Sequence, residues 1–484
     1  MSTLLIFIII FLFFAMLLGV SYFTSRNANS ETFFTGNRRS PWYLVAFGMI
    51  GSTISGVTFI SVPGEVGNTA WTYLQFLLGN FIGYWIIAMV LIPLYYRLNL
   101  VSIYTYLDQR FGIRSYKTGA FFFLVSQTIG ASFRLYLAAG VLQIAFFNAL
   151  GIPFWVTVML TLLLIWAYTF RAGIKTVVWT DSLQTLFILG AVGITIWVIS
   201  DKLNLGISEM IATVSNHPYS QMFDWEWQSK TNFFKQFAAG LGIVIVLNGL
   251  DQNMMQKNLT CKTQQDAQKN MFWFSFAFII ANLFFLCLGV LLYYFAQQKG
   301  IALPERSDDL FPMLAIQHFG ILAGALFLLG ILSAAYSSAD SALTALTTSF
   351  CIDLLNLKAD SPNNKSTRLK VHIGFTVLMF LVIVLFRMIN NDSVVTAVFR
   401  VAGYTYGPLL GLFAFGILMK NQVKDRFVPY ICLLSPLLSY MISVNSKAWL
   451  GGYEFGFELL LLNGLITFLG LLIFTKKTKL TANS

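Results

Sequence analysis

The sequence predicts an all-α integral membrane protein, and three observations support that fold class. Of the 484 residues, 57% are hydrophobic and 11% are charged, whereas a soluble domain carries about a quarter charged residues. Apolar runs recur along the whole chain, and many have the length of about 20 residues that a helix needs to cross a bilayer. No long polar segment separates these runs, so we expect a single transmembrane unit over residues 1–484.

Thirteen apolar segments are predicted to cross the membrane as helices. No basic region precedes the first, and no small-residue cleavage site follows it, so a retained helix is favoured over a signal peptide. The seventh has the weakest pattern because it is short and rich in glycine. In chain order the predicted spans are 3–22, 42–63, 71–96, 118–148, 153–170, 176–200, 236–252, 271–296, 320–352, 371–390, 394–418, 427–445 and 455–475.

The distribution of basic residues predicts the orientation. An odd number of spans places the two termini on opposite sides. The connections on one side, with the carboxyl-terminal tail, carry 22 Lys and Arg residues, and those on the other side carry 7. Basic residues concentrate in cytoplasmic loops, so we expect the amino terminus outside and the carboxyl terminus in the cytoplasm. The same bias accounts for the net charge of +11, which therefore gives no reason to expect a nucleic-acid partner.

The sequence offers no pattern for enzyme chemistry. Its four cysteines and three histidines are far apart along the chain, without the spacing of a zinc site or of a nucleophile with its base. We therefore expect no enzyme and no cofactor. No obligate protein partner is indicated, and the expected partners are a small solute, a cation and the bilayer.

Span 42–63 carries small and polar residues at its centre. The stretch 48–58 reads GMIGSTISGVT, with three glycines and four hydroxyl residues. Such a stretch can unwind, which frees carbonyls for a cation and amides for an anion, as in transporters with discontinuous helices. The alternative is a small-residue face that lets two helices approach closely.

A second polar face lies on span 320–352. Ala334, Ser337 and Ser338 stand at i, i+3 and i+4 and so share one side of the helix, and Ser341 extends it by a turn. Two hydroxyls beside free carbonyls form an all-oxygen site suited to a hard monovalent ion. The neighbouring Asp340 is an acid inside an apolar span, which costs about 3 kcal/mol unless it is paired. The alternative is that the hydroxyls bond back to the preceding turn.

Three further polar residues lie inside spans. Asp181 stands one to two turns inside span 176–200, where it could ligate a cation, relay a proton or cap the helix. Arg134 lies near the middle of its span and could form a bidentate fork with a carboxylate, either on a substrate or on Asp340 or Asp181. Asn248 ends the seventh span and either lines a cavity or terminates the helix.

Four motifs are typical of one family. The run 168–181 reads YTFRAGIKTVVWTD and is similar to its signature, although Ala172 replaces a usual glycine. The segments 52–66, 251–257 and 403–411 resemble its other motifs. On these motifs the chain resembles the sodium/solute symporter family, in particular the branch of the iodide, monocarboxylate and sialic-acid transporters.

The resemblance implies a LeuT-like fold. Two inverted repeats of five helices would cover 42–200 and 236–418, with an extra helix at 3–22 before them and two carboxyl-terminal helices within 427–475. The first helix of each repeat would be broken. The protein would be a multi-pass protein of the cell membrane.

The resemblance also implies site residues. A principal sodium site would use the carbonyls of Gly51, Ile54 and Ala334 and the hydroxyls of Ser337 and Ser338. Some members bind a second sodium, and a candidate second cation site here would use Asp181, Asp340 and Ser341. Asp340 replaces a residue that is often serine in those members, so it could strengthen that site, pair with Arg134 or carry a proton.

Substrate-binding candidates complete the prediction. Ser55 and Thr58 match positions that contact sialic acid in the sialic-acid members, and Arg134 lies about one turn from their arginine. Gln75 is the nearest match to a polar residue of the sugar members. The candidate substrate residues are Thr53, Ser55, Thr58, Gln75, Arg134 and Asn248.

We therefore expect a sodium-coupled symporter that imports a small organic solute by alternating access. An anionic solute, monocarboxylate or sialic-acid-like, is favoured, and sodium is the expected coupling ion and the one expected metal. The alternatives are a sodium-coupled sugar, polyol or amino-acid symporter, a proton-coupled or facilitative transporter, and a membrane sensor module.

Overall fold

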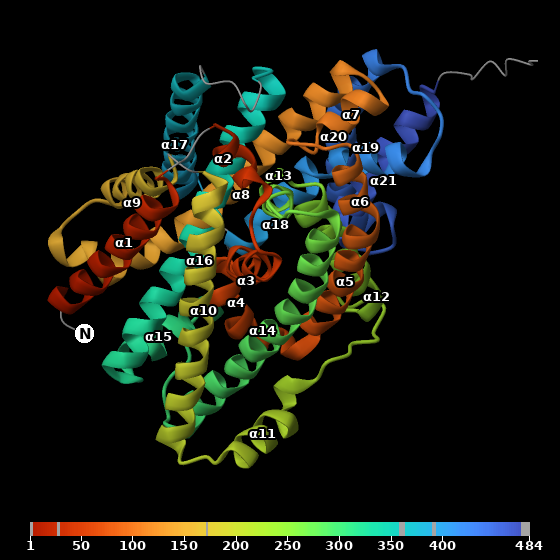
Figure 1. The fold of residues 1–484 in the computed structure, drawn as a ribbon. Coiled ribbons are helices and arrows are strands. Elements are labelled where there is room, and N and C mark those ends of the chain that lie inside the picture. The colour runs from red at the N-terminus through yellow and green to blue at the C-terminus, as the bar shows by residue number, and fades with distance from the viewer. Residues whose placement is uncertain (1–2, 27–29, 171–172, 358–363, 390–393, 476–484) are drawn as a thin grey trace, which may run out of the picture.

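The computed structural model describes residues 3–26, 30–170, 173–357, 364–389 and 394–475. This described part is a bundle of helices without a named β-strand (Figure 1). Residues 171–172 of the signature run and the tail 476–484 lie outside it. The long helices are α1 (Thr3–Thr24), α8 (Ile113–Ala145), α10 (Ile174–Leu203), α14 (Gln264–Gln298), α16 (Gly320–Ser349), α17 (Asn364–Ile389) and α20 (Val428–Trp449).

Each of the thirteen predicted spans coincides with helix in the structure. Among the described residues, 8 helices are long and apolar enough to cross a membrane, or up to 9 when one bent pair counts as a single span. The shorter apolar helices are α3 (Trp42–Thr53), α9 (Phe154–Thr169), α19 (Gly407–Leu418) and α21 (Leu459–Ile473). The number of membrane crossings and the sides on which the termini lie therefore remain predictions.

The helical runs that open the two predicted repeats are both interrupted. The first is α3, which ends at Thr53 and is followed by α4 (Gly56–Thr69). The second is α12 (Phe233–Val244), extended by a π-helical turn to Gly249 and followed by α13 (Gln252–Asn258) at an angle of 66°. Both interruptions fall within the two segments in which the sequence predicts broken helices.

The centre of the bundle is formed by α10 and α16. In Figure 1 these helices lie side by side, with α3 and α4 next to them. Residues 330–349 of α16 are all buried. Gly51 permits the close approach of α3 to α10, because a Cβ atom at this position would lie 2.4 Å from Thr185 Oγ1. The polar residues predicted to form the site therefore lie in the middle of the fold.

One sequence-based assignment is wrong. Lys257 counted among the basic residues of the cytoplasmic connection 253–270, but the structure places it in α13, with 1% of its side chain exposed. The helix resumes after the interruption, which an apolar window that ends at residue 252 does not reveal. The excess of basic residues on that side remains.

Candidate functional site

The interruption between α3 and α4 releases backbone carbonyls. Ile54 N–H donates to Ile50 O at 2.9 Å and closes α3, whereas Phe59 N–H donates to Ser55 O at 2.9 Å and opens α4. In a continuous helix the Ser55 N–H would bond to the Gly51 carbonyl, but it donates to Thr53 O at 3.0 Å. The Gly51 carbonyl therefore loses its helical partner, and Ile54 stands between the two halves.

The polar face of α16 lies against this interruption. Ser338 Oγ donates to Ser52 O at 3.3 Å, and the side chains of Ala334, Ser337 and Ser338 are buried. The predicted carbonyls and hydroxyls of the sodium site thus come from two helices that meet here. All five are neutral oxygen donors, which is the ligand chemistry that hard cations prefer.

Asp181 lies beside this face and is held by several partners. Its Oδ1 accepts a hydrogen bond from Ser337 Oγ at 2.5 Å. Its Oδ2 lies 2.6 Å from Lys257 Nζ and accepts a longer bond from Ser341 Oγ at 3.4 Å. Asp181 is therefore neither a helix cap nor a partner of Arg134, and its described cationic partner is Lys257.

Asp340 joins the same cluster through hydroxyl groups. Its Oδ1 lies 3.1 Å from Ser341 Oγ, and its Oδ2 accepts a hydrogen bond from Tyr168 OH at 2.9 Å. The structure thus brings together the three residues of the candidate second cation site, Asp181, Asp340 and Ser341. It adds Lys257 and Tyr168, to which the sequence analysis gave no role.

The packing of α10 on α3 positions Asp181. Thr185 Oγ1 accepts a hydrogen bond from Gly51 N–H at 3.0 Å, and Ser182 Oγ lies 3.0 Å from Leu44 O. A Cβ atom at Gly48 would lie 3.1 Å from Asp181 Cβ, so glycine allows this approach. These contacts hold the carboxylate next to the interrupted helix.

A central cavity of about 660 Å³ opens next to the interruption. Its lining includes five of the six residues predicted to bind substrate: Thr53, Ser55, Thr58, Arg134 and Asn248. Drug-sized ligands occupy pockets of about 300–1,000 Å³, so the volume suits a small organic solute.

Arg134 contributes a cationic side chain to the lining of the cavity. Nε of this side chain is buried and has no hydrogen-bond partner among the described residues. Because Asp181 pairs with Lys257 and Asp340 with hydroxyls, neither acid takes the guanidinium. A half-buried guanidinium with an unused donor is suited to a carboxylate of a bound solute.

Gln75 does not line the cavity. Its Nε2 donates to Thr231 O at 2.8 Å, and its Oε1 accepts from Asp224 N–H at 3.1 Å. Gln75 is completely buried and fastens the connection that precedes α12. The structure therefore gives it a structural contact and brings the other five candidates together without it.

The mouth of the cavity is acidic. Glu65, Glu305 and Asp308 line it together with Arg306, and Glu65 Oε1 accepts a hydrogen bond from Ser307 Oγ at 2.7 Å. Burial raises the pKa of Asp308, and the negative charge of the nearby Glu65 raises it further. A negatively charged mouth concentrates cations near the entrance.

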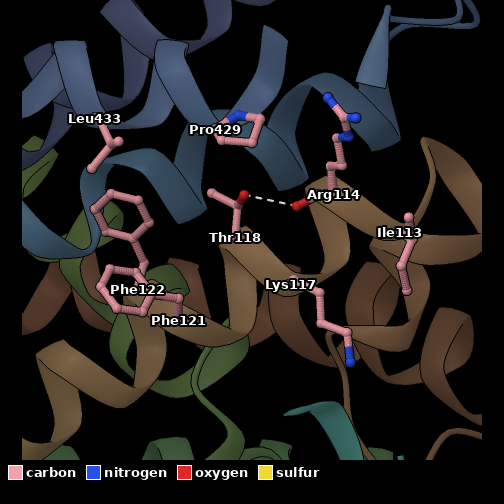
Figure 2. A pocket seen from close by; sticks show the side chains of 8 residues that line it. All are labelled: Ile113, Arg114, Lys117, Thr118, Phe121, Phe122, Pro429 and Leu433. Carbon is pink, nitrogen blue, oxygen red and sulfur yellow. Dashed lines mark hydrogen bonds between the residues drawn. The ribbon is translucent and has the colours of Figure 1, made fainter. Parts of the chain in front are cut away.

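A second hollow lies between α8 and α20 and differs in character (Figure 2). Its volume is about 470 Å³, and its lining is mostly apolar, with Arg114, Lys117 and Thr118. Lys117 turns away toward the end of α16, where its Nζ lies 2.9 Å from Asn356 Oδ1. None of the predicted site residues lies here, so the central cavity is the candidate solute site.

Comparison with known proteins identifies the family. The model of the sodium:solute symporter family matches residues 33–425. The chain belongs to this family.

Relatives within the symporter family include proteins with named solutes. The chain is 25% identical to the sodium/sialic acid symporter SiaT of Proteus mirabilis, over 84% of this chain and 83% of that protein. It is 26% identical to the sodium/sialic acid symporter NanT of Aliivibrio fischeri, over 90% and 85%. It is 25% identical to the human sodium/iodide cotransporter, over 81% of this chain and 61% of that protein.

Solved structures give the same fold. A substrate-bound, outward-open Na⁺-coupled sialic acid symporter has a TM-score of 0.81 at 22% identity, with 97% of both chains covered. A nucleobase-cation-symport-1 family transporter in a closed conformation has a TM-score of 0.55 at 12% identity, over 92% of this chain and 93% of that chain. The all-helical architecture of the symporter family member described here is thus shared with cation-coupled transporters.

Proposed function

We propose that this protein is a sodium-coupled symporter that imports a small organic anion, monocarboxylate or sialic-acid-like, by alternating access. The observation that carries the proposal is the released Gly51 carbonyl at the interruption, opposite the buried hydroxyls of α16. Membership of the sodium:solute symporter family supports the same function. Solutes of this class have a carboxylate that Arg134 can bind.

The proposed sodium site uses oxygens from both helices. The carbonyls of Gly51, Ile54 and Ala334 and the hydroxyls of Ser337 and Ser338 would surround the ion. Sodium would then tie α3 to α16 at the edge of the cavity, so sodium and solute would each increase the affinity for the other.

The proposed direction of transport follows from the difference between the two ends of the site. The cavity extends from the interruption along α4 to Glu65 and to residues 305–308, which belong to the predicted outer side. On the other side, Tyr406 OH lies 2.5 Å from Asp251 Oδ2, and this contact would close the path to the cytoplasm. A rocking movement of the helices would open that side. The membrane potential would add about 2.3 kcal/mol per charge per 100 mV to the driving force for sodium entry.

The proposed topology is the LeuT-like arrangement of two inverted repeats, 42–200 and 236–418, within thirteen spans. The two interruptions would be equivalent positions in the repeats. The amino terminus would lie outside, and the carboxyl terminus in the cytoplasm.

A thermal-shift experiment tests the function. The purified full-length protein is heated in sodium and in choline buffer with a panel of carboxylates, sialic acids, sugars, polyols and amino acids. A ligand at 100 times its dissociation constant adds about 2.7 kcal/mol to stability. We expect a carboxylate to stabilise the protein in sodium buffer only.

The other outcomes favour specific alternatives. A sugar, polyol or amino-acid shift that needs sodium would change the solute class and keep the coupling. A shift independent of sodium would favour a proton-coupled or facilitative transporter. The absence of any shift from sodium itself would contradict the proposed ion site.

A further inference from the structure

The ion pair between Lys257 and Asp181 joins two distant parts of the chain. Lys257 Nζ lies 2.6 Å from Asp181 Oδ2, with side-chain exposures of 1% and 0%. Asp181 belongs to α10, and Lys257 belongs to α13, the short helix that follows the second interruption. A pair this deeply buried is costly to form and costly to break, because removal of one partner leaves the other charge unpaired.

The groups around the Asp181 carboxylate that pairs with this ammonium are oxygens. Ser337 and Ser341 contact the Asp181 carboxylate, and Asp340 lies beside Ser341 with Tyr168 on its other oxygen. Two carboxylates and two serine hydroxyls form a donor set for a hard cation. The Lys257 ammonium lies 2.6 Å from Asp181 Oδ2, one oxygen of this set.

We propose that Lys257 is a tethered cation that fills the second cation site, so that the transporter couples one sodium ion and not two. This inference rests on the proposed function. The lysine ammonium is a compact point charge with three donors, and it satisfies the charge of Asp181 without an ion from solution.

For an electrostatic reason, Lys257 and a second sodium ion cannot both bind Asp181. A sodium ion on the same carboxylate would lie within a few ångströms of the ammonium, and like charges at that distance repel strongly inside a protein. The carboxylate oxygens are also engaged already. Ser337 and Lys257 contact Asp181, and Tyr168 and Ser341 contact Asp340.

The tethered charge also bears on the principal sodium site through Ser337. The Ser337 hydroxyl donates its hydrogen to Asp181, which leaves its lone pairs for a cation. Lys257 keeps Asp181 paired in this position. The lysine is thus a positioning residue for the principal site as well as the occupant of the second.

Sodium binding to the purified full-length protein tests the inference. Radioactive sodium alone is the probe, and equilibrium binding gives the number of ions per chain, with thermal stability measured in sodium and choline. We expect about one sodium per wild-type chain and about two for Lys257→Met, whose stability becomes sodium-dependent because sodium replaces the lost charge.

Two further variants control for side effects. Lys262→Met removes an exposed lysine five residues away, and we expect it to bind sodium as the wild type does. The double variant Lys257→Met with Asp181→Asn removes both charges, and we expect it to lose the second ion. It also keeps the test valid if Lys257→Met does not fold.

The results separate this inference from the proposed function. Two sodium ions on the wild type would overturn the tethered cation and leave sodium coupling intact. A folded Lys257→Met variant that binds one ion, with stability independent of sodium, would also overturn it, as would a second ion retained by the double variant. No sodium on the wild type would overturn the proposed function and this inference with it.

Discussion

The two helix interruptions differ in what happens to their carbonyls. At the second, Tyr95 OH donates to Gly249 O at 2.9 Å, and Tyr104 OH donates to Leu250 O at 3.0 Å. Asp251 Oδ1 then accepts from Asn253 N–H at 2.8 Å and starts α13. At the first, no side chain in the part of the chain that the structure describes replaces the bond that the Gly51 carbonyl loses, so this carbonyl remains available to an ion.

The contrast teaches that an interrupted helix is not by itself an ion site. Both interruptions expose backbone groups, and buried backbone groups must be satisfied. Tyrosine hydroxyls donate hydrogen bonds to the carbonyls of the second interruption and make it a fixed bend. The first depends on what it binds, which is why we assign sodium to the interruption between α3 and α4.

The largest expected effect is at the first interruption. Ser338→Ala removes a proposed ligand, and we expect the sodium concentration that stabilises the protein to rise by about tenfold to a hundredfold, or about 1.4–2.8 kcal/mol. Thermal shift against sodium alone measures this. Ser333→Ala is the matched control, because this buried hydroxyl on α16 has no partner among the described residues. Equal sodium dependence in both variants would contradict the assignment.

The next effect concerns the cavity between the interruptions. Arg134→Lys keeps the charge and loses the bidentate fork. We expect about tenfold weaker binding of the carboxylate that the panel identifies, equivalent to about 1.4 kcal/mol, with the sodium shift in the absence of solute unchanged. A loss of protein yield as large as the loss of binding would instead favour a structural role.

At the second interruption we expect no effect on sodium or solute binding, and a change in stability alone. Tyr104→Phe leaves the buried Leu250 carbonyl without its donor, which costs about 1–3 kcal/mol. The melting temperature should fall, and the sodium dependence should stay that of the wild type. Tyr106→Phe, two residues further on, is the control. A change in sodium dependence would mean that both interruptions serve the ion.

The smallest effect on transport is expected at Gln75. Gln75→Leu removes the contacts with Thr231 and Asp224, at a cost of about 1 kcal/mol in stability. Solute affinity in the thermal-shift panel should not change. A clear loss of affinity would show that Gln75 contacts the solute after all, as the resemblance to the sugar members suggested.

Much of this arrangement is predictable because it depends on local sequence. The glycine- and hydroxyl-rich stretch of span 42–63 predicts the first interruption. Helical spacing alone places Ser337 and Ser338 on one face. Partners that come from distant segments are not predictable in this way. In the sequence Lys257 looks like a loop residue, and only the structure shows that α13 places it beside Asp181. Nothing in the sequence indicates that Tyr95 and Tyr104 donate hydrogen bonds to the carbonyls of the second interruption.

The buried ion pair also bears on how the chain is assembled in the membrane. Asp181 is synthesised before Lys257, and a lone charged residue inside an inserting helix is costly, about 3 kcal/mol at the centre and less toward the ends. Until α13 is made, α10 must therefore enter the bilayer with an uncompensated acid. The charge of Asp181 in the first half of the protein is thus compensated only by Lys257 in the second half. A nascent chain that stops before Lys257 should therefore be an early substrate for membrane quality control.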